Sequence, residues 1–265
     1  DLHGFLYSVF HFFVIFLTFY SISIYSRASL YINRPRTKDV LALGTAMLLF
    51  TILLKIWLFV VSLLVGYFTS IPSDVFLLLF PFVGIAILCR VIFSSEIAAL
   101  TSIATAVIVG LITDGNFPIT GYALFSSFVA VIAVRKFEQR AAILKAGVYA
   151  GLFQMFLGAA VIFAKVYTVN FSWYHIAYSV GAGFISGIVS ALLAEATVPV
   201  FEYFFNYTTN LKLLEFANST SMLLRDLLVK APGTYHHSSV VGQLAAAGAD
   251  AIGANSLLAR VGALY

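Results

Sequence analysis

Two adjacent histidines near the carboxyl end, His236 and His237, are the side chains in this sequence best suited to chemistry. Imidazole is a common ligand of transition metals and titrates close to neutral pH. A helix predicted over Tyr235–Ile252 carries both. Its 3.6-residue period places His237 on an apolar face and His236 nearer the rim of that face. The residues that define this face are Val240, Val241, Leu244, Ala245, Ala251 and Ile252. From the pattern alone, His237 is either a core histidine whose ring nitrogens are hydrogen-bonded or a metal ligand.

Two ionisable side chains, Lys55 and Glu195, fall inside long apolar runs. A charge at bilayer depth costs about 2.5–3.5 kcal/mol on insertion scales, so such a residue is a functional candidate. Lys55 can instead extend its amine towards the outer headgroups, and Glu195 can lie at the inner interface beside Glu202. The expected depths of Lys55 and Glu195 differ by roughly 15 Å at 1.5 Å per residue, which makes a direct pair between them improbable.

The composition requires a membrane to position these residues. The chain has 265 residues, of which 62% are hydrophobic and only 10% are charged, and its mean hydropathy is +1.01. Soluble domains carry about 25% charged residues. The apolar residues form runs of a length that crosses about 30 Å of hydrocarbon as a helix. The chain is therefore predicted to be all-α, with a polytopic bundle of seven transmembrane helices. The predicted spans are 4–24, 40–63, 75–93, 97–112, 119–134, 141–164 and 176–205.

The distribution of cations predicts the orientation of this bundle. Most of the 15 Lys and Arg residues fall in the loops 26–39 and 135–140 and in the tail after residue 205. The positive-inside rule then places the amino terminus outside and the carboxyl tail in the cytoplasm. The same rule accounts for the net charge of +4, so no nucleic acid polymer is expected as a partner. The single cysteine, Cys89, excludes an internal disulfide bond.

Small residues recur at four-residue spacing in the last two predicted spans, as in Gly147 and Gly151 or Gly183 and Gly187. This spacing allows two helices to approach closely in lipid. The pattern fits packing within the bundle and, as the alternative, a homodimer interface.

After residue 205 the sequence becomes polar and predicts short cytoplasmic helices. Met222–Lys230 is one of them, Ala231-Pro232-Gly233 is predicted to stop it, Thr234 to cap the next, and Leu257 to begin another. The predicted domains are the seven-helix region 1–205, a cytoplasmic connector 206–218, and the beginning of a cytoplasmic all-α domain at 219–265.

Residues 213–265 closely resemble the opening of the HD domain in bacterial seven-transmembrane HD phosphohydrolases of the PgpH type. The segment APGTYHHS at 231–238 is the most specific part of this match. The resemblance implies a protein of the bacterial cytoplasmic membrane with an outer ligand-binding-like domain and a cytoplasmic HD domain that hydrolyses cyclic di-AMP. It further implies that His237 is the first metal ligand and that His236 lies just outside the metal or faces the substrate.

In the family, the pattern ARVGA-x-Y is followed at once by the His-Asp pair that gives the HD domain its name. This sequence ends at Tyr265, before that pair. It also begins with Asp1 rather than Met, so we expect it to be an internal part of a longer protein whose outer sensor domain comes first. We expect these 265 residues alone to bind no metal and to be inactive.

The resemblance also implies a mechanism for the intact protein. Two divalent transition metals, Mn or Fe, would activate a hydroxide that attacks the phosphodiester, under control of the membrane region. Two other functions remain open. One is a receptor or anchor that binds another protein through a degenerate HD domain, and the other is a small-molecule transporter.

Overall fold

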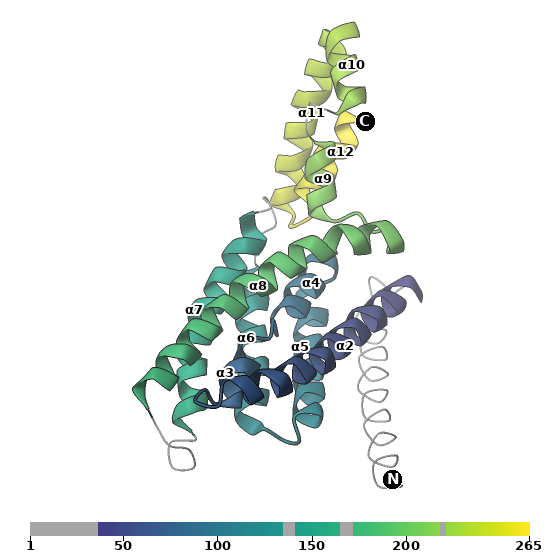
Figure 1. Ribbon diagram of the computed structural model, residues 1–265. Coiled ribbons are helices and arrows are strands. Elements are labelled where there is room, and N and C mark those ends of the chain that lie inside the picture. Colours follow the sequence, from purple (N-terminus) through teal and green to yellow (C-terminus); the bar gives the residue numbers. More distant parts are fainter. Residues whose placement is uncertain (1–36, 135–140, 165–171, 218–220) are drawn as a thin grey trace. The chain divides into compact units, whose positions relative to one another are not determined.

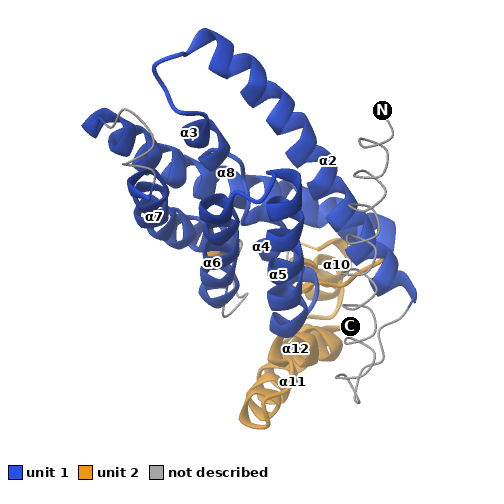
Figure 2. Ribbon diagram, turned by 90° about the horizontal axis from the view of Figure 1, so that it is seen from below, with its two compact units in different colours: residues 1–135, 143–205 blue, residues 136–142, 206–265 orange. Residues whose placement is uncertain are grey.

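The computed structural model describes residues 37–134, 141–164, 172–217 and 221–265, and every regular element within these ranges is an α-helix (Figure 1). This confirms the all-α prediction. The predicted first span, 4–24, lies outside the described residues. The chain divides into two compact units, residues 1–135 with 143–205 and residues 136–142 with 206–265, which are coloured separately in Figure 2.

The first unit contains the helices that are long and apolar enough to cross a membrane. Four described helices meet that requirement, and they correspond to the second, fourth, sixth and seventh predicted spans. The fifth predicted span is a shorter apolar helix of 17 residues. The helices of this unit are α2 (Thr37–Tyr67), α3 (Ser73–Leu78), α4 (Gly84–Ile92), α5 (Ser95–Ile112), α6 (Phe117–Ala133), α7 (Ala141–Phe163) and α8 (Trp173–Phe205).

The prediction of a single helix over residues 75–93 is wrong, because the segment is divided into α3 and α4. Pro81 lies in the break between them. Proline has no backbone N–H and disfavours helical geometry in the residue before it, so it interrupts a helix. A break inside a bilayer frees carbonyl groups that need new donors, because no water is available there.

Side chains from three other helices donate to carbonyl groups at this break. Trp57 Nε1 on α2 donates to the carbonyl oxygen of Phe76 at 3.0 Å. Tyr122 Oη on α6 donates to Leu78 O at 3.2 Å, and Ser186 Oγ on α8 donates to Phe80 O at 2.6 Å. Phe76 O and Phe80 O also accept from Leu79 N and Phe82 N. The polar side chains therefore add to the backbone hydrogen bonds at the break and hold it within the bundle.

Side chains also fix the beginnings of α5 and α6. Ser94 Oγ accepts from Ile97 N, and Asn116 Oδ1 accepts from Ile119 N, as expected of N-cap residues. Asn116 Nδ2 also donates to Asp74 Oδ1 at 3.3 Å, which ties the turn before α6 to the first turn of α3.

Close backbone contact joins α7 and α8, which run side by side in both ribbon views (Figures 1 and 2). A methyl group on Gly183 would lie 2.6 Å from the carbonyl oxygen of Gln154, and one on Gly158 would lie 2.8 Å from that of Ser179. Gly187 meets Gly147 and Gly151 in the same way. The four-residue spacing of small residues thus serves packing within the bundle, as the first of the two predicted alternatives requires.

The second unit contains α9 (Asn210–Phe216), α10 (Met222–Lys230), α11 (Pro232–Ala251) and α12 (Ser256–Leu264). Its core is small. The buried large apolar side chains among its described residues are Leu213, Leu224, Val261 and Leu264. The segment predicted as a connector therefore contributes a side chain, Leu213 of α9, to the core of this unit.

Candidate functional site

The candidate histidines lie in the first turns of α11, which begins earlier than the sequence suggested. Ala231 is the N-cap and Pro232 is the first helical residue. Proline suits this position because its missing N–H would have no partner within the helix and its φ angle is already helical. The prediction that Pro232 and Gly233 separate two helices, with Thr234 as the cap, is therefore wrong: only Ala231 separates α10 from α11.

One face of α11 is covered, and it is formed by small residues. Gly242 is buried against α12, where a methyl group in its place would lie 3.2 Å from Arg260 O and 3.6 Å from Ala263 Cβ. Tyr235, Ser238, Ser239, Ala245, Ala246 and Ala249 are half-buried around the same face. The small residues around Gly242 allow α12 to approach α11 closely.

The opposite face of α11 carries the larger apolar side chains and is open. Val240, Val241 and Leu244 are 42%, 41% and 69% exposed. His237 shares this face by helical register and is exposed, as is His236. His237 therefore shares a helix face with Val240 and Leu244, as the sequence predicts. Within the part of the chain that the structure describes, however, no other segment buries His237.

A metal site needs several ligands at once, and the described residues do not provide them. No group of three or more His, Cys, Asp or Glu side chains gathers within the described ranges. His236 and His237 are neighbours in sequence, and an exposed pair of this kind does not enclose an ion. Either imidazole could contribute one ligand to such a site.

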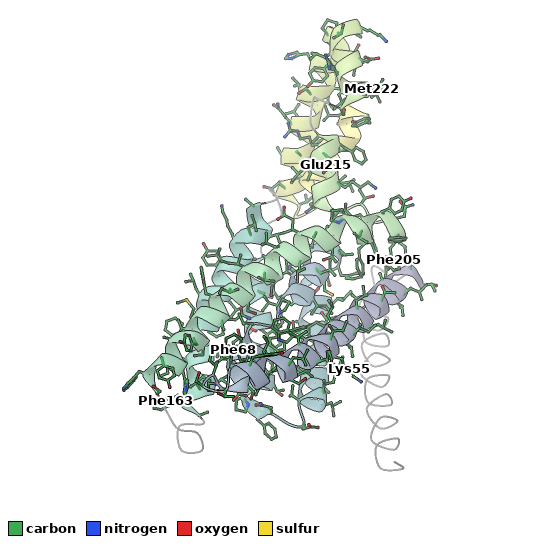
Figure 3. The ribbon with its side chains drawn as sticks, viewed as in Figure 1. Lys55, Phe68, Phe163, Phe205, Glu215 and Met222 are labelled. Carbon is green, nitrogen blue, oxygen red and sulfur yellow. The ribbon has the colours of Figure 1, made fainter. Side chains whose placement is uncertain are left out.

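Lys55 lies on the outward side of α2, not in the interior of the bundle. The side chain is exposed, and Figure 3 shows it projecting away from the other helices of the first unit that the structure describes. Ile52, Ile56 and Phe59 beside it are also exposed, so this side of the helix has the composition of a lipid-facing surface. This position fits an amine that extends towards the headgroups rather than a residue that lines a transport path.

Glu195 is half-buried on α8, one helical turn before Pro199. No ion pair joins Glu195 to Lys55. Lys230 and Asp226 do form an ion pair, at 3.1 Å within α10, but both side chains are exposed. Among the residues that the structure describes, neither candidate therefore has a charged partner that would mark an intramembrane site.

Sequence reasoning missed the set of side chains around the helix break. Pro81 was the available signal, together with polar residues such as Tyr122 and Ser186 at mid-span positions. Individual partners do not follow from spacing, because they come from helices more than 40 residues away in the chain. Since protein side chains and backbone N–H groups donate to the carbonyls at this break, it has the features of a structural element and not of a transporter's open ion site.

Comparison with known proteins supplies a context for both units. A family model described as a 7TM receptor with an intracellular HD hydrolase matches residues 4–209. A cyclic-di-AMP phosphodiesterase PgpH from Listeria monocytogenes is 31% identical over 236 residues, covering 88% of this chain and 32% of the relative. Another, from Bacillus subtilis, is 34% identical over 228 residues, covering 83% of this chain and 31% of the relative.

An uncharacterized protein from Synechocystis is 32% identical over 97 residues, which is 37% of this chain and 12% of the relative. The chain thus spans about a third of the length of the two phosphodiesterases that it matches. No solved structure matches the chain.

Proposed function

The chain belongs to the family of seven-transmembrane receptors with an intracellular HD hydrolase, and we propose that the whole protein is a membrane-bound phosphodiesterase that hydrolyses cyclic di-AMP. The relatives that cover most of this chain carry that activity in their names. The proposal extends their activity to the protein of which these residues are part.

One observation carries the proposal. The two matches to named phosphodiesterases cover 88% and 83% of the chain, which is more than the segment up to residue 209 contains. The similarity therefore continues past residue 209, from the membrane unit into the second unit. A protein that shared only a membrane anchor with these relatives would be similar over the first unit alone.

Within this function, His237 is assigned one metal ligand position and His236 a position beside the metal or the substrate. Both sit in the first turns of α11, where helix geometry fixes their directions relative to the open apolar face. A divalent transition metal, when bound, would supply the hydroxide that attacks phosphorus and would neutralise charge on the phosphate oxygens. The described residues supply too few donors to derive a chemical step from them.

The proposal also includes the orientation of the protein in the membrane. The carboxyl-terminal unit is placed in the cytoplasm, where the nucleotide is available, and the amino terminus outside. The cation distribution supports this orientation, because loops rich in Lys and Arg remain on the cytoplasmic side of membranes.

The test uses the full-length protein, purified from membranes, with cyclic di-AMP and cyclic di-GMP as competing substrates. The wild type is expected to hydrolyse cyclic di-AMP. His237→Ala is expected to lose bound metal, measured by mass spectrometry, and hydrolysis, while it remains in the membrane fraction. Gln243→Ala is the matched control, since Gln243 is an exposed residue of the same helix.

Two outcomes would contradict the proposal at different points. Full metal content and activity in His237→Ala would remove this residue from the site. A wild-type protein with bound metal but no phosphodiesterase activity would favour the receptor or anchor function, in which the second unit acts by binding another protein.

A further inference from the structure

The short helix α9 connects the two units in sequence and packs as part of the second. It follows the end of α8 after residues 206–209, and it begins at the position where the family match ends. Leu213, at its middle, is 4% exposed. A free linker would expose such a side chain, so α9 is anchored in the core of the second unit.

Two hydrogen bonds join α9 to α12, one at each end of α9. Asn255 Nδ2, at the N-cap of α12, donates to Asn210 Oδ1 at 3.3 Å. Tyr265 Oη, at the other end of α12, donates to the carbonyl oxygen of Phe216 at 3.2 Å. The Phe216 carbonyl belongs to the last turn of α9, where carbonyl groups have no partner within the helix.

The Tyr265 side chain makes further contacts that hold its hydroxyl in place. Its ring meets the ring of Phe216 edge to face, with centroids 6.3 Å apart. Its hydroxyl also lies 2.9 Å from Ser221 Oγ, at the N-cap of α10. One side chain therefore links α9, α10 and α12.

Attachment at both ends has a mechanical consequence. A single contact would let α9 pivot about that point, whereas two contacts about 9 Å apart, at 1.5 Å per residue, fix both its position and its axis. Leu213 adds a third, apolar contact between them. Any displacement of α9 must then displace α12 with it, unless these contacts break.

We propose that α9 is the coupling element between the membrane unit and the hydrolase unit, with Asn255 and Tyr265 as the positioning residues that transmit its displacement to α12. This inference rests on the proposed function in one respect, namely that the residues after 209 open the hydrolase unit. The regulatory input is a shift of the end of α8, and the output is the position of α12 against α11, the helix that carries His237.

The first arm of the test does not depend on activity. Hydrogen–deuterium exchange is measured on the full-length protein and on Tyr265→Phe, which removes the hydroxyl but keeps the ring. Exchange is expected to rise in peptides of both α9 and α12, because both bonds of the hydroxyl are lost together. Tyr203→Phe, the same change at an exposed residue of α8, should leave both peptides unchanged. A rise in α12 alone would overturn the coupling.

The second arm measures hydrolysis of cyclic di-AMP. Tyr265→Phe is expected to lower kcat by roughly three- to tenfold with KM unchanged, because substrate contacts remain while α12 is less well positioned. Cysteines at 210 and 255, joined by a short reversible cross-linker in the Tyr265→Phe background, should restore kcat, and cleavage of the cross-link should lower it again. A structural defect elsewhere would not respond to the tether.

The outcomes of the two arms are separable. An unchanged kcat in Tyr265→Phe, or no rescue by the cross-link, would overturn the positioning role even if exchange changes. A wild-type protein without hydrolysis would contradict the proposed function and the positioning role together, whereas the exchange arm would still decide whether α9 and α12 move as one body.

Discussion

Ser186 Oγ on α8 donates a 2.6 Å hydrogen bond to the carbonyl oxygen of Phe80, the residue immediately before Pro81. This bond joins the broken segment between α3 and α4 to the long helix that precedes the second unit. Ser190, one turn further along α8, is equally buried, but its hydroxyl has no hydrogen-bond partner among the described residues. The two serines thus form a natural pair of test and control positions.

Ser186→Ala is expected to destabilise the protein by about 0.6–1.7 kcal/mol, the range found for hydrogen bonds between membrane helices. The loss follows because the hydrogen bond between α8 and the break disappears, which leaves the Phe80 carbonyl with Phe82 N as its donor. Thermal unfolding of the purified protein in detergent measures this effect. Ser190→Ala removes no hydrogen bond and should be neutral or slightly stabilising, so an equal loss in both variants would contradict the assigned role of Ser186.

Gly183→Ala is expected to destabilise the first unit by about 1–3 kcal/mol or more, because its methyl group would overlap the backbone of α7 at Gln154. Gly181 provides the control, since no atom lies within 4 Å of a methyl group placed there. Gly181→Ala should be neutral or stabilising by up to about 1 kcal/mol, through helix propensity. Similar melting temperatures for the two variants would show that α7 and α8 are not in close backbone contact.

Lys55→Leu is expected to leave both membrane insertion and cyclic di-AMP hydrolysis unchanged. The amine faces outward among exposed apolar residues, so its replacement removes a cost of insertion without breaking a contact between helices. Hydrolysis by the purified variant and its melting temperature are the measurements. A large fall in activity would instead identify Lys55 as a functional residue of the membrane unit.

The orientation predicts the accessibility of single cysteines to a membrane-impermeant thiol reagent. Thr69, in the connection between α2 and α3, and Gln243, on α11, are both exposed. In intact cells, Thr69→Cys should be labelled and Gln243→Cys should be labelled only after permeabilisation. The native Cys89 is buried and should give little background. Labelling of Gln243→Cys in intact cells would reverse the topology and exclude a cytoplasmic hydrolase.

Much of the fold can be predicted because the strongest signal in the sequence is the length of each apolar run. The helices α5, α6, α7 and α8 begin and end within three residues of the predicted spans, and α10 has the predicted bounds. The extent of each apolar run determines where its helix begins and ends, because a single segment inside a bilayer satisfies its own backbone hydrogen bonds only as a helix. The start of α11 was misjudged because a proline that stops one helix can also begin the next.

Other features depend on contacts that spacing does not contain. The break at Pro81 is stabilised by Trp57, Tyr122 and Ser186, which belong to three different helices. The sequence correctly placed His237 on the same face as Val240 and Leu244, but whether that face is covered depends on which other segments pack there. The helical period shows which side chains share a face, but it does not show which other segment packs against that face.

The length of α8 has a consequence for how this helix fits a bilayer. Its 33 residues extend for about 50 Å, whereas the hydrocarbon layer is about 30 Å thick. The helix must lean across the layer or emerge from it, and a helix under such hydrophobic mismatch changes its tilt when the bilayer thickens or thins. Because α9 follows after only residues 206–209, a change in the tilt of α8 would move the residue from which the second unit begins.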